Sequence, residues 1–432
     1  MLSVRFIRQE KERVLRSLEL RNEPNPEAKV EAIFHLDDQR KQLQKSLDDS
    51  RAEAKRASKR YGQIMKSGTQ AEQQAVKSAG ETRKKNIAEL EQKIKDTGNQ
   101  LEELLLSMPN AVHPSVPTGN THKDNKVHQA WLSELPNLGV EAKPHWDLMK
   151  EYRLVDQETG AKLTGAGFML YEGKGAKLQR ALINFFLDEA GKAGYKEFMP
   201  PHLVRTETAR ATGQLPDKEG QMYYIANNTS SERLYLIPTA EVPLTNIYRK
   251  AILDEEDFPI RLVGHTPCFR REAGSYGAQV KGLNRVHQFD KVEIVQIQHP
   301  DRSYETLEEM SRHVEGLLQK LELPYRILLL CGGDLGFASA LTFDFETYSV
   351  AQQRWLEVSS VSNFEEFQAS RLELRFRAKG DKRKRFAHTL NGSALALPRI
   401  MATLIENNQT AGGIHIPKVL QAYTGFDFIE PL

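Results

Sequence analysis

The chain has 432 residues, of which 27% are charged, and its formal net charge at pH 7 is +2. Its length predicts two or three domains, and it has no run of about 18 apolar residues that would predict a membrane-spanning helix. Because the charge is nearly balanced, a nucleic-acid surface would have to come from local clustering of basic residues, and the opening MLSVRFIRQEKERV lacks the apolar segment of a secretory signal.

Residues 27–105 have the pattern of a coiled-coil hairpin. Apolar and small residues recur at three-four spacing over 33–64 and again over 76–104. The segment GQIMKSGT, 62–69, contains two glycines and separates the two series, which fold most simply as an antiparallel pair of helices. Near this tip the repeat positions are small (Ala54, Ala57 and Gly80), so the tip should be the less stable end.

The part of the first predicted helix near the tip is strongly basic. Within 51–60 there is one acidic residue, Glu53, and there are five basic ones: Arg51, Lys55, Arg56, Lys59 and Arg60. Long basic helices suit a phosphate backbone, where shape rather than base edges is read. On composition alone, a solvated coiled-coil face is the favoured explanation of these charges.

A linker rich in Pro, Asn and Gly, 108–125, separates the hairpin from a segment of mixed pattern. Amphipathic helices are predicted at 175–194 and 399–408, and strands at 234–239, 261–269, 291–297, 325–330, 341–350 and 354–360. Strands outnumber helices and lie close together, which favours an α+β domain with an antiparallel sheet over a parallel βαβ fold. We therefore expect two domains, 1–107 and 108–432, and the chain has no G-x-G-x-x-G or Walker A sequence.

Three groups of residues in the second domain could carry chemistry. Arg270, Arg271 and Glu272 follow an apolar segment and precede a polar loop, where an arginine can bind a phosphate through two hydrogen bonds. Thr239 and Glu241 are two residues apart in PTAEVPLTN, so on a strand they would face the same side and could hold an ammonium group. Glu357 and Ser360 offer hard oxygen ligands suited to Mg²⁺.

Cysteine is scarce in the chain. Cys268 and Cys331 are its two cysteines, which argues against a disulfide scaffold and against a zinc site built from thiolates. We expect no zinc, and two reduced thiols packed as small apolar side chains in a cytoplasmic protein.

Four sequence strings together resemble seryl-tRNA synthetases, a family of class II aminoacyl-tRNA synthetases. TPCFRREAGSYG with HQFDKVE resembles motif 2, and HTLNGSALALPRIM resembles motif 3. PTAEVPLTN is similar to the family's serine-binding TxE loop, and EVSSVSNFEEFQASR is similar to its E-[IV]-S-S-x-S-N stretch. The helix from Gly175 and the strand ending at Pro200 and Pro201 resemble motif 1 more loosely, and PHWDL, 144–148, is a further family-like string.

The resemblance implies a role for each matched residue. Arg270 and Arg399 would be catalytic through the α- and γ-phosphates of ATP. ATP would contact Arg270, Arg271, Glu272, Val286, Phe289, Glu357, Val358, Ser359, Ser360 and Arg399. Serine would contact Thr239, Ala240, Glu241, Arg270, Glu293, Asn391 and Ser393. Glu357 and Ser360 would hold Mg²⁺, and the tRNA would contact Arg51, Lys55, Arg56, Lys59, Arg60 and Lys281.

Two positions depart from the family pattern. Pro398 precedes Arg399 where a glycine is usual, which a helix start tolerates. In the motif 2 loop, Ala278 to Lys281 replace an arginine-bearing segment and keep one charge, Lys281, which bears on tRNA contacts rather than on ATP binding.

The resemblance implies a homodimeric ligase that activates serine with ATP and transfers it to serine tRNA, with selenocysteine tRNA as a further possible substrate. Two alternatives stay open at this stage. One is a synthetase-like ligase that loads an amino acid onto a carrier protein, which would need no basic hairpin. The other is a non-catalytic RNA-binding relative, which should have lost Arg270, Glu357 or Arg399, yet all three are present.

Overall fold

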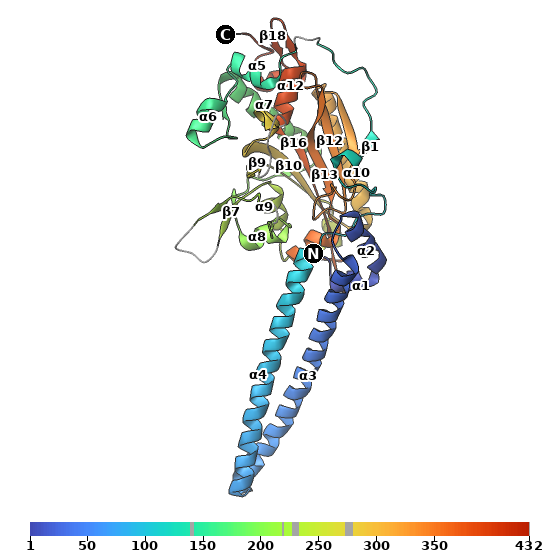
Figure 1. Ribbon diagram of the computed structural model, residues 1–432, viewed down its shortest axis with the longest axis vertical. Helices are drawn as coiled ribbons and strands as arrows, with labels where there is room; N and C mark the ends of the chain where they lie inside the picture. Colours follow the sequence, from blue (N-terminus) through green and yellow to red (C-terminus); the bar gives the residue numbers. More distant parts are fainter. Residues whose placement is uncertain (139–141, 218–219, 227–232, 273–279, 432) are drawn as a thin grey trace. The chain divides into compact units, whose positions relative to one another are not determined.

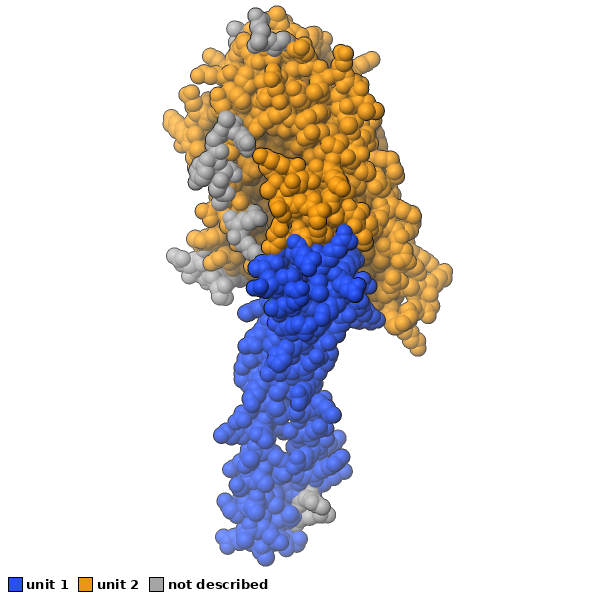
Figure 2. Space-filling model, turned by 45° about the vertical axis from the view of Figure 1, so that its right-hand side comes forward, with its two compact units in different colours: residues 1–19, 23–109 blue, residues 20–22, 110–432 orange. Residues whose placement is uncertain are grey.

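The structure is a computed structural model of the whole chain. It describes residues 1–138, 142–217, 220–226, 233–272 and 280–431, and within helix α3 it leaves out the side chains of Arg60 and Gln63. The chain forms two compact units, coloured separately in Figure 2. Unit 1 comprises residues 1–19 and 23–109, and unit 2 comprises residues 20–22 and 110–432.

Unit 1 is helical and contains the predicted hairpin. Its elements are α1 (Val4–Gln9), α2 (Lys11–Leu20), α3 (Pro26–Ser67) and α4 (Gln70–Ser107). Helices α3 and α4 run side by side as an antiparallel pair (Figure 1). The expected break at 62–69 is shorter than predicted, because α3 continues through Gly62 and only Gly68 and Thr69 are non-helical. A capping box explains this sharp reversal, since the Thr69 amide donates to Glu72 Oε2 at 2.7 Å.

Burial along the hairpin follows the predicted repeat but fades toward the tip. Ile33 and Leu47 are fully buried on α3, as are Thr97 and Leu101 on α4. Between Leu47 and Thr97, no side chain that the structure describes is fully buried. The outer half of the hairpin therefore gains little from apolar burial, which agrees with the small residues of its repeat.

Unit 2 is built on an eight-stranded sheet, and the fold is α+β as predicted. The strand order is β1 (Lys126–Gln129), β11 (Tyr325–Leu329), β12 (Leu341–Ser349), β13 (Arg354–Asn363), β16 (His388–Ala396), β10 (Gln288–Gln298), β9 (Ile260–Phe269) and β4 (Lys196–Glu197). All neighbours pair antiparallel except β4 and β9, which are parallel. Among the described residues, no helix has both the length and the apolar character needed to cross a membrane.

One face of this sheet is apolar and forms the main core. Val263, Val292 and Ile294 lie on this face and share one cluster with residues of helices α7 (Gly173–Lys192), α10 (Ser303–Lys320) and α12 (Leu397–Asn407). The helices predicted at 175–194 and 399–408 are α7 and α12, whereas α10 and strand β16 were not predicted as such. The alternate residues of the same strands point to the opposite face, which we call the site face.

The short helix α9 (Glu241–Asn246) begins just after a segment that was predicted to be a strand. A strand was predicted for 234–239, but strand β7 (Leu234–Leu236) ends earlier, and Thr239 and Glu241 lie at the start of α9. Pro243 lies in the first turn of this helix, where no backbone amide is needed for an intrahelical bond. Helix α9 packs onto the site face because Ala240 and Leu244 join a cluster with Leu262 and Val295.

Candidate active site

Strand alternation brings several of the predicted site residues to the site face. Phe289 pairs with Cys268, Lys291 with Thr266 and Glu293 with Gly264, so the odd-numbered residues of β10 point to one side. Across the ladder to β16, Glu293 pairs with Ser393 and Val295 with Asn391. Phe289 and Glu293 on β10, and Asn391 and Ser393 on β16, were predicted to contact ATP or serine and therefore lie on the same face of the sheet.

Arg270 lies just past the end of β9 and is held from both sides. Its backbone amide donates to the His287 carbonyl at 2.9 Å, and its Nε donates to the Pro238 carbonyl at 3.4 Å. Its guanidinium carbon lies 5.4 Å from the centre of the Phe289 ring. A cation beside an aromatic face, both partly exposed, can receive a phosphate and a flat heterocycle together.

The residues after Arg270 are arranged less simply than the resemblance implied. Arg271 is exposed, and its amide donates to the Gln221 carbonyl at 2.9 Å. Glu272 forms an ion pair with Arg285, with 2.8 Å between Oε2 and Nη1, while Val286 is buried next to it. Arg285 therefore belongs to this site. The sequence patterns gave Arg285 no role, because it is thirteen positions from Glu272 along the chain.

The candidate pocket for an ammonium group is centred on Glu241. Glu241 is buried, and its Oε1 accepts from Gln368 Nε2 at 2.6 Å, while Thr239 Oγ1 accepts from the Glu241 amide at 3.2 Å. Thr389 in turn donates to Gln368 Oε1 at 2.8 Å. Burial and the nearby Glu293 raise the pKa of Glu241 to about 7. Gln368 holds this carboxylate and was missed by the sequence analysis.

Glu293 is the second buried carboxylate of the pocket. Its side chain forms an ion pair with Lys291, two residues away on the same face of β10, and its Oε1 accepts from Asn391 Nδ2 at 2.9 Å. Lys291 is 6% exposed, so it is a buried cation whose charge partly offsets the charges of Glu241 and Glu293. Ser393 lies across the ladder from Glu293, and its carbonyl accepts from Ser359 Oγ at 2.6 Å. Lys291 was quoted in the matching string but was given no role.

Glu357 and Ser360 reach the same face through a β-bulge. Residues three apart on a regular strand point to opposite faces, but the ladder to β12 skips Val358, pairing Phe345 with Ser359 and Glu346 with Glu357. Ser360 Oγ therefore lies 3.3 Å from Glu357 Oε1. Asp344, which pairs with Ser360 across the ladder, has a buried Oδ1 without a hydrogen-bond partner among the described residues. Burial, and then Glu357, raise the pKa of Asp344 well above its usual value.

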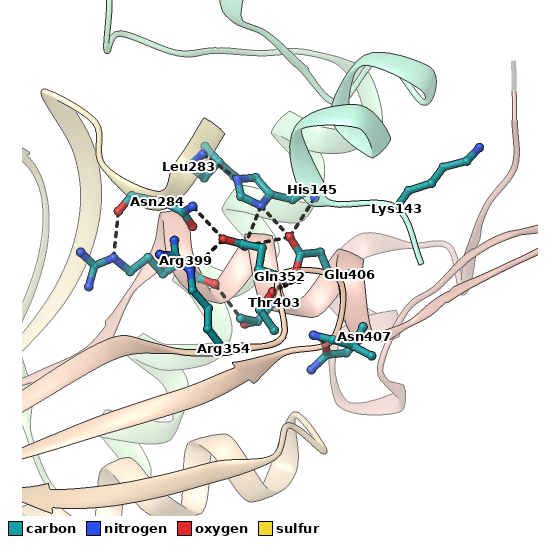
Figure 3. A network of polar contacts seen from close by, with 12 residues as sticks. Lys143, His145, Leu283, Asn284, Gln352, Arg354, Arg399, Thr403, Glu406 and Asn407 are labelled. Atoms are coloured by element: carbon teal, nitrogen blue, oxygen red, sulfur yellow. Dashed lines mark hydrogen bonds and ion pairs between the residues drawn. The ribbon is translucent and has the colours of Figure 1, made fainter. Parts of the chain in front are cut away.

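Arg399 lies in the first turn of α12, next to Pro398, and contacts both Asn284 (Figure 3) and Glu357. Its Nε donates to the Asn284 carbonyl at 2.9 Å, and its Nη1 donates to the Glu357 carbonyl at 2.8 Å. Nη1 also lies 3.4 Å from Glu357 Oε2. Among the described residues, no hydrogen bond engages Nη2 of this half-buried guanidinium, which can therefore bind a phosphate.

The residues predicted to contact tRNA are found in both units. On the hairpin, Lys55, Arg56 and Lys59 are exposed, while Arg51 pairs with Glu91 at 2.8 Å. The side chain of Arg60 and the loop residues Ala278 and Gln279 lie outside the described residues. In unit 2, the ammonium of Lys281 lies 4.5 Å from the centre of the Trp146 ring.

Comparisons with known proteins identify the family of the chain. Residues 1–112 match the seryl-tRNA synthetase N-terminal domain, and residues 223–408 match the tRNA synthetase class II core domain (G, H, P, S and T). The serine–tRNA ligase of Salinibacter ruber is 45% identical over 99% of this chain and 98% of the relative. The crystal structure of seryl-tRNA synthetase from Pyrococcus horikoshii complexed with ATP matches with a TM-score of 0.90 and 33% identity, covering 100% of both chains. A cytoplasmic serine–tRNA ligase from Naegleria fowleri in complex with AMP matches with a TM-score of 0.85 and 26% identity over 100% of this chain and 99% of that one. On the strength of the identity to the Salinibacter protein over almost the whole chain, this protein belongs to the seryl-tRNA synthetase family.

Proposed function

We propose that the protein is a serine–tRNA ligase that activates serine with ATP and then transfers it to the terminal adenosine of serine tRNA. The observation that best supports this function is the meeting of Arg270 and Phe289 with two buried carboxylates, Glu241 and Glu293, on one face of a class II sheet. Arg270 and Phe289 suit the phosphate and adenine of ATP, while the carboxylates suit the ammonium and hydroxyl of serine.

The first step needs no nucleophile from the protein. A carboxylate oxygen of serine attacks the α-phosphorus of ATP, the bond to the pyrophosphate oxygen breaks, and seryl-adenylate and pyrophosphate result. Arg270 stabilises the charge that develops on the α-phosphate oxygens, and Arg399 holds the departing pyrophosphate. Because both guanidiniums are held by backbone carbonyls, they need little reorganisation as the reaction proceeds.

Selection of serine rests on the partners of Glu241 and Glu293. Glu241, held by Gln368, takes the ammonium group, while Glu293 and Asn391 take the hydroxyl. Alanine as substrate would leave these buried polar groups unpaired, so kcat/KM for alanine should be far lower than kcat/KM for serine.

This assignment predicts a pH dependence that is specific for serine. With a pKa of about 7, Glu241 is ionised above that pH and neutral below it, and only the ionised form attracts the ammonium. The KM for serine should therefore fall about tenfold from pH 6 to pH 8, while the KM for ATP stays nearly constant. Initial rates of pyrophosphate exchange at each pH measure both constants. E241Q should remove the pH dependence, and a flat KM for serine in the unmodified protein would contradict the assignment.

Glu357, Ser360 and the ATP phosphates fit Mg²⁺. The donors are a carboxylate and a hydroxyl 3.3 Å apart, and the Glu357 side chain is 48% exposed, which leaves room for phosphate oxygens and water. No group of three or more His, Cys, Asp or Glu side chains among the described residues could hold a metal by itself. When bound, Mg²⁺ would offset the charge of the triphosphate.

Removal of the Glu357 carboxylate should raise the demand for Mg²⁺. In E357Q, the Mg²⁺ concentration that gives half-maximal exchange should rise at least about tenfold, because a charged ligand is lost. The matched control is E346Q, since Glu346 lies opposite Glu357 in the ladder but is bonded to Arg326 at 2.5 Å. Titration of exchange with Mg²⁺ at fixed ATP measures this, with direct Mn²⁺ binding as a second readout. An equal shift in both variants would contradict the metal assignment.

The wider assignment follows the same proposal. Residues 1–107 act as the tRNA-binding domain and 108–432 as the catalytic domain, working in the cytoplasm as a homodimer. Met199, which is 93% exposed, adjoins Pro200 and Pro201 in the segment that resembles motif 1, where a partner subunit would cover it.

Charging of serine tRNA with labelled serine tests the ligase function. Loading of serine onto a carrier protein instead would support the alternative ligase.

A further inference from the structure

We infer that His145 is a positioning residue that sets the orientation of Arg399 through the backbone of the 3₁₀ turn Gly282–Asn284. His145 belongs to helix α5 (His145–Glu151), and neither it nor Glu406 was assigned a role by the sequence. The inference deepens the proposed function, because it rests on Arg399 acting on ATP. It concerns a buried network that surrounds that arginine (Figure 3).

The network begins at a fully buried hydrogen bond between a histidine and a carboxylate. His145 and Glu406 side chains are both 0% exposed, and His145 Nδ1 lies 2.7 Å from Glu406 Oε1. The same carboxylate oxygen accepts from the His145 amide at 2.8 Å, and the second oxygen accepts from Ser349 Oγ. Glu406 is therefore satisfied on both oxygens and fixes the ring of His145 in place.

The other ring nitrogen of His145 forms a hydrogen bond with the 3₁₀ turn. Its Nε2 accepts from the Leu283 amide at 2.9 Å, so the ring proton lies on Nδ1 and points to Glu406. Gly282 makes this approach possible, since its φ is +64° and a Cβ there would lie 2.2 Å from His145 Nε2. Lys281 lies over Trp146 next to it, so two consecutive residues of α5 hold this end of the motif 2 segment.

The same turn is also hydrogen-bonded to helix α12, through Arg399. The Asn284 carbonyl accepts from Arg399 Nε at 2.9 Å, and Arg399 lies seven residues before Glu406, two turns along one face of the helix. Glu406, His145, Leu283, Asn284 and Arg399 thus form a closed ring of contacts. Gln352 links two members of this network directly. Its Nε2 donates to Glu406 at 3.0 Å, and its Oε1 accepts from Asn284 Nδ2 at 2.9 Å.

A packing role and a positioning role predict different results for two substitutions of His145. Asparagine can place an amide donor near the position of Nδ1 and keeps the link to Glu406, but it loses the acceptor for Leu283. Glutamine can place an amide oxygen near the position of Nε2 and keeps the link to Leu283, but it loses the donor to Glu406. Each variant removes one buried hydrogen bond, so both should lower the thermal unfolding midpoint by a similar amount.

The experiment measures serine-dependent pyrophosphate exchange and Mg·ATP binding by calorimetry in both variants. H145N should lower kcat/KM for ATP by about hundredfold and weaken Mg·ATP binding, because Arg399 is displaced, while the KM for serine stays unchanged. H145Q should stay within about threefold of the unmodified protein. Equal loss in both variants, equal retention in both, or loss in H145Q alone would overturn the inference.

Failure of the proposed function would look different from failure of this inference. If the unmodified protein shows no exchange with serine, the proposed function fails, and Mg·ATP binding then decides the role of His145. Weaker binding in H145N than in H145Q would still support it, and equal binding would overturn it.

Discussion

Replacement of Arg270 by alanine is expected to lower kcat for serine-dependent pyrophosphate exchange by about 10³-fold, or about 4 kcal/mol. Arg270 is the cation at the end of β9 that lies beside Phe289, and its Nε is held by the Pro238 carbonyl at 3.4 Å. An arginine held in this way stabilises the charge that develops on the α-phosphate, and a truncated side chain leaves that charge without a partner. Steady-state exchange kinetics in R270A measure the loss.

The matched control for R270A is R261A, at the other end of the same strand. Arg261 forms an ion pair with Glu309 at 2.6 Å and is partly exposed, so its loss should cost about 1 kcal/mol of stability or less and leave exchange unchanged. Lysine at position 270 should restore only part of the activity, because it cannot bind a phosphate through two parallel hydrogen bonds. Activity of R270A within about tenfold of the unmodified protein would contradict the assigned role.

Reversal of three charges on the hairpin is expected to separate tRNA charging from serine activation. In K55E/R56E/K59E, kcat/KM for serine tRNA should fall about hundredfold, and exchange without tRNA should stay unchanged. The three side chains are exposed on α3, so the substitutions remove no buried contact and should leave the helix pair folded. Each lost phosphate contact should also reduce the salt dependence of binding by about one unit of slope.

The control for the hairpin is K55R/R56K/K59R, which keeps the charge at every position. It should charge tRNA nearly as well as the unmodified protein, because phosphate contacts of this kind depend on charge more than on side-chain shape. If the reversed variant charges tRNA normally, these residues form a solvated coiled-coil face and the tRNA contacts lie elsewhere. If it also loses exchange, the substitutions have damaged more than tRNA binding.

The sequence predicted the strands of the site best where alternation was regular. Strands β9 and β10 lie close to their expected ranges, because apolar and polar residues alternate along part of each sequence, although residues 291–298 of β10 are all buried. The coiled-coil repeat likewise predicted α3 and α4, although the capping box at Thr69 made the reversal shorter than two glycines suggested. Local patterns of this kind are set by neighbours in the chain.

Features that depend on distant neighbours could not be predicted. Glu357 and Ser360 share a face only because of the bulge at Val358, and no residue pattern signals that bulge. Gln368 meets Glu241 across 127 positions of sequence, and His145 meets Glu406 across 261. The helix at Glu241 had a local signal, since Pro243 is typical of a first helical turn, but the apolar run before it favoured a strand.

Pyrophosphate exchange with Mg·ATP, run across the twenty amino acids without tRNA, tests the central claim most directly. The account predicts exchange with serine and none above background with alanine, because the buried groups around Glu293 need a hydroxyl partner. Exchange with a different amino acid would keep the fold and the ATP site but contradict the roles of Thr239, Glu241 and Glu293. Exchange with none of the twenty would contradict the claim that this chain is a ligase.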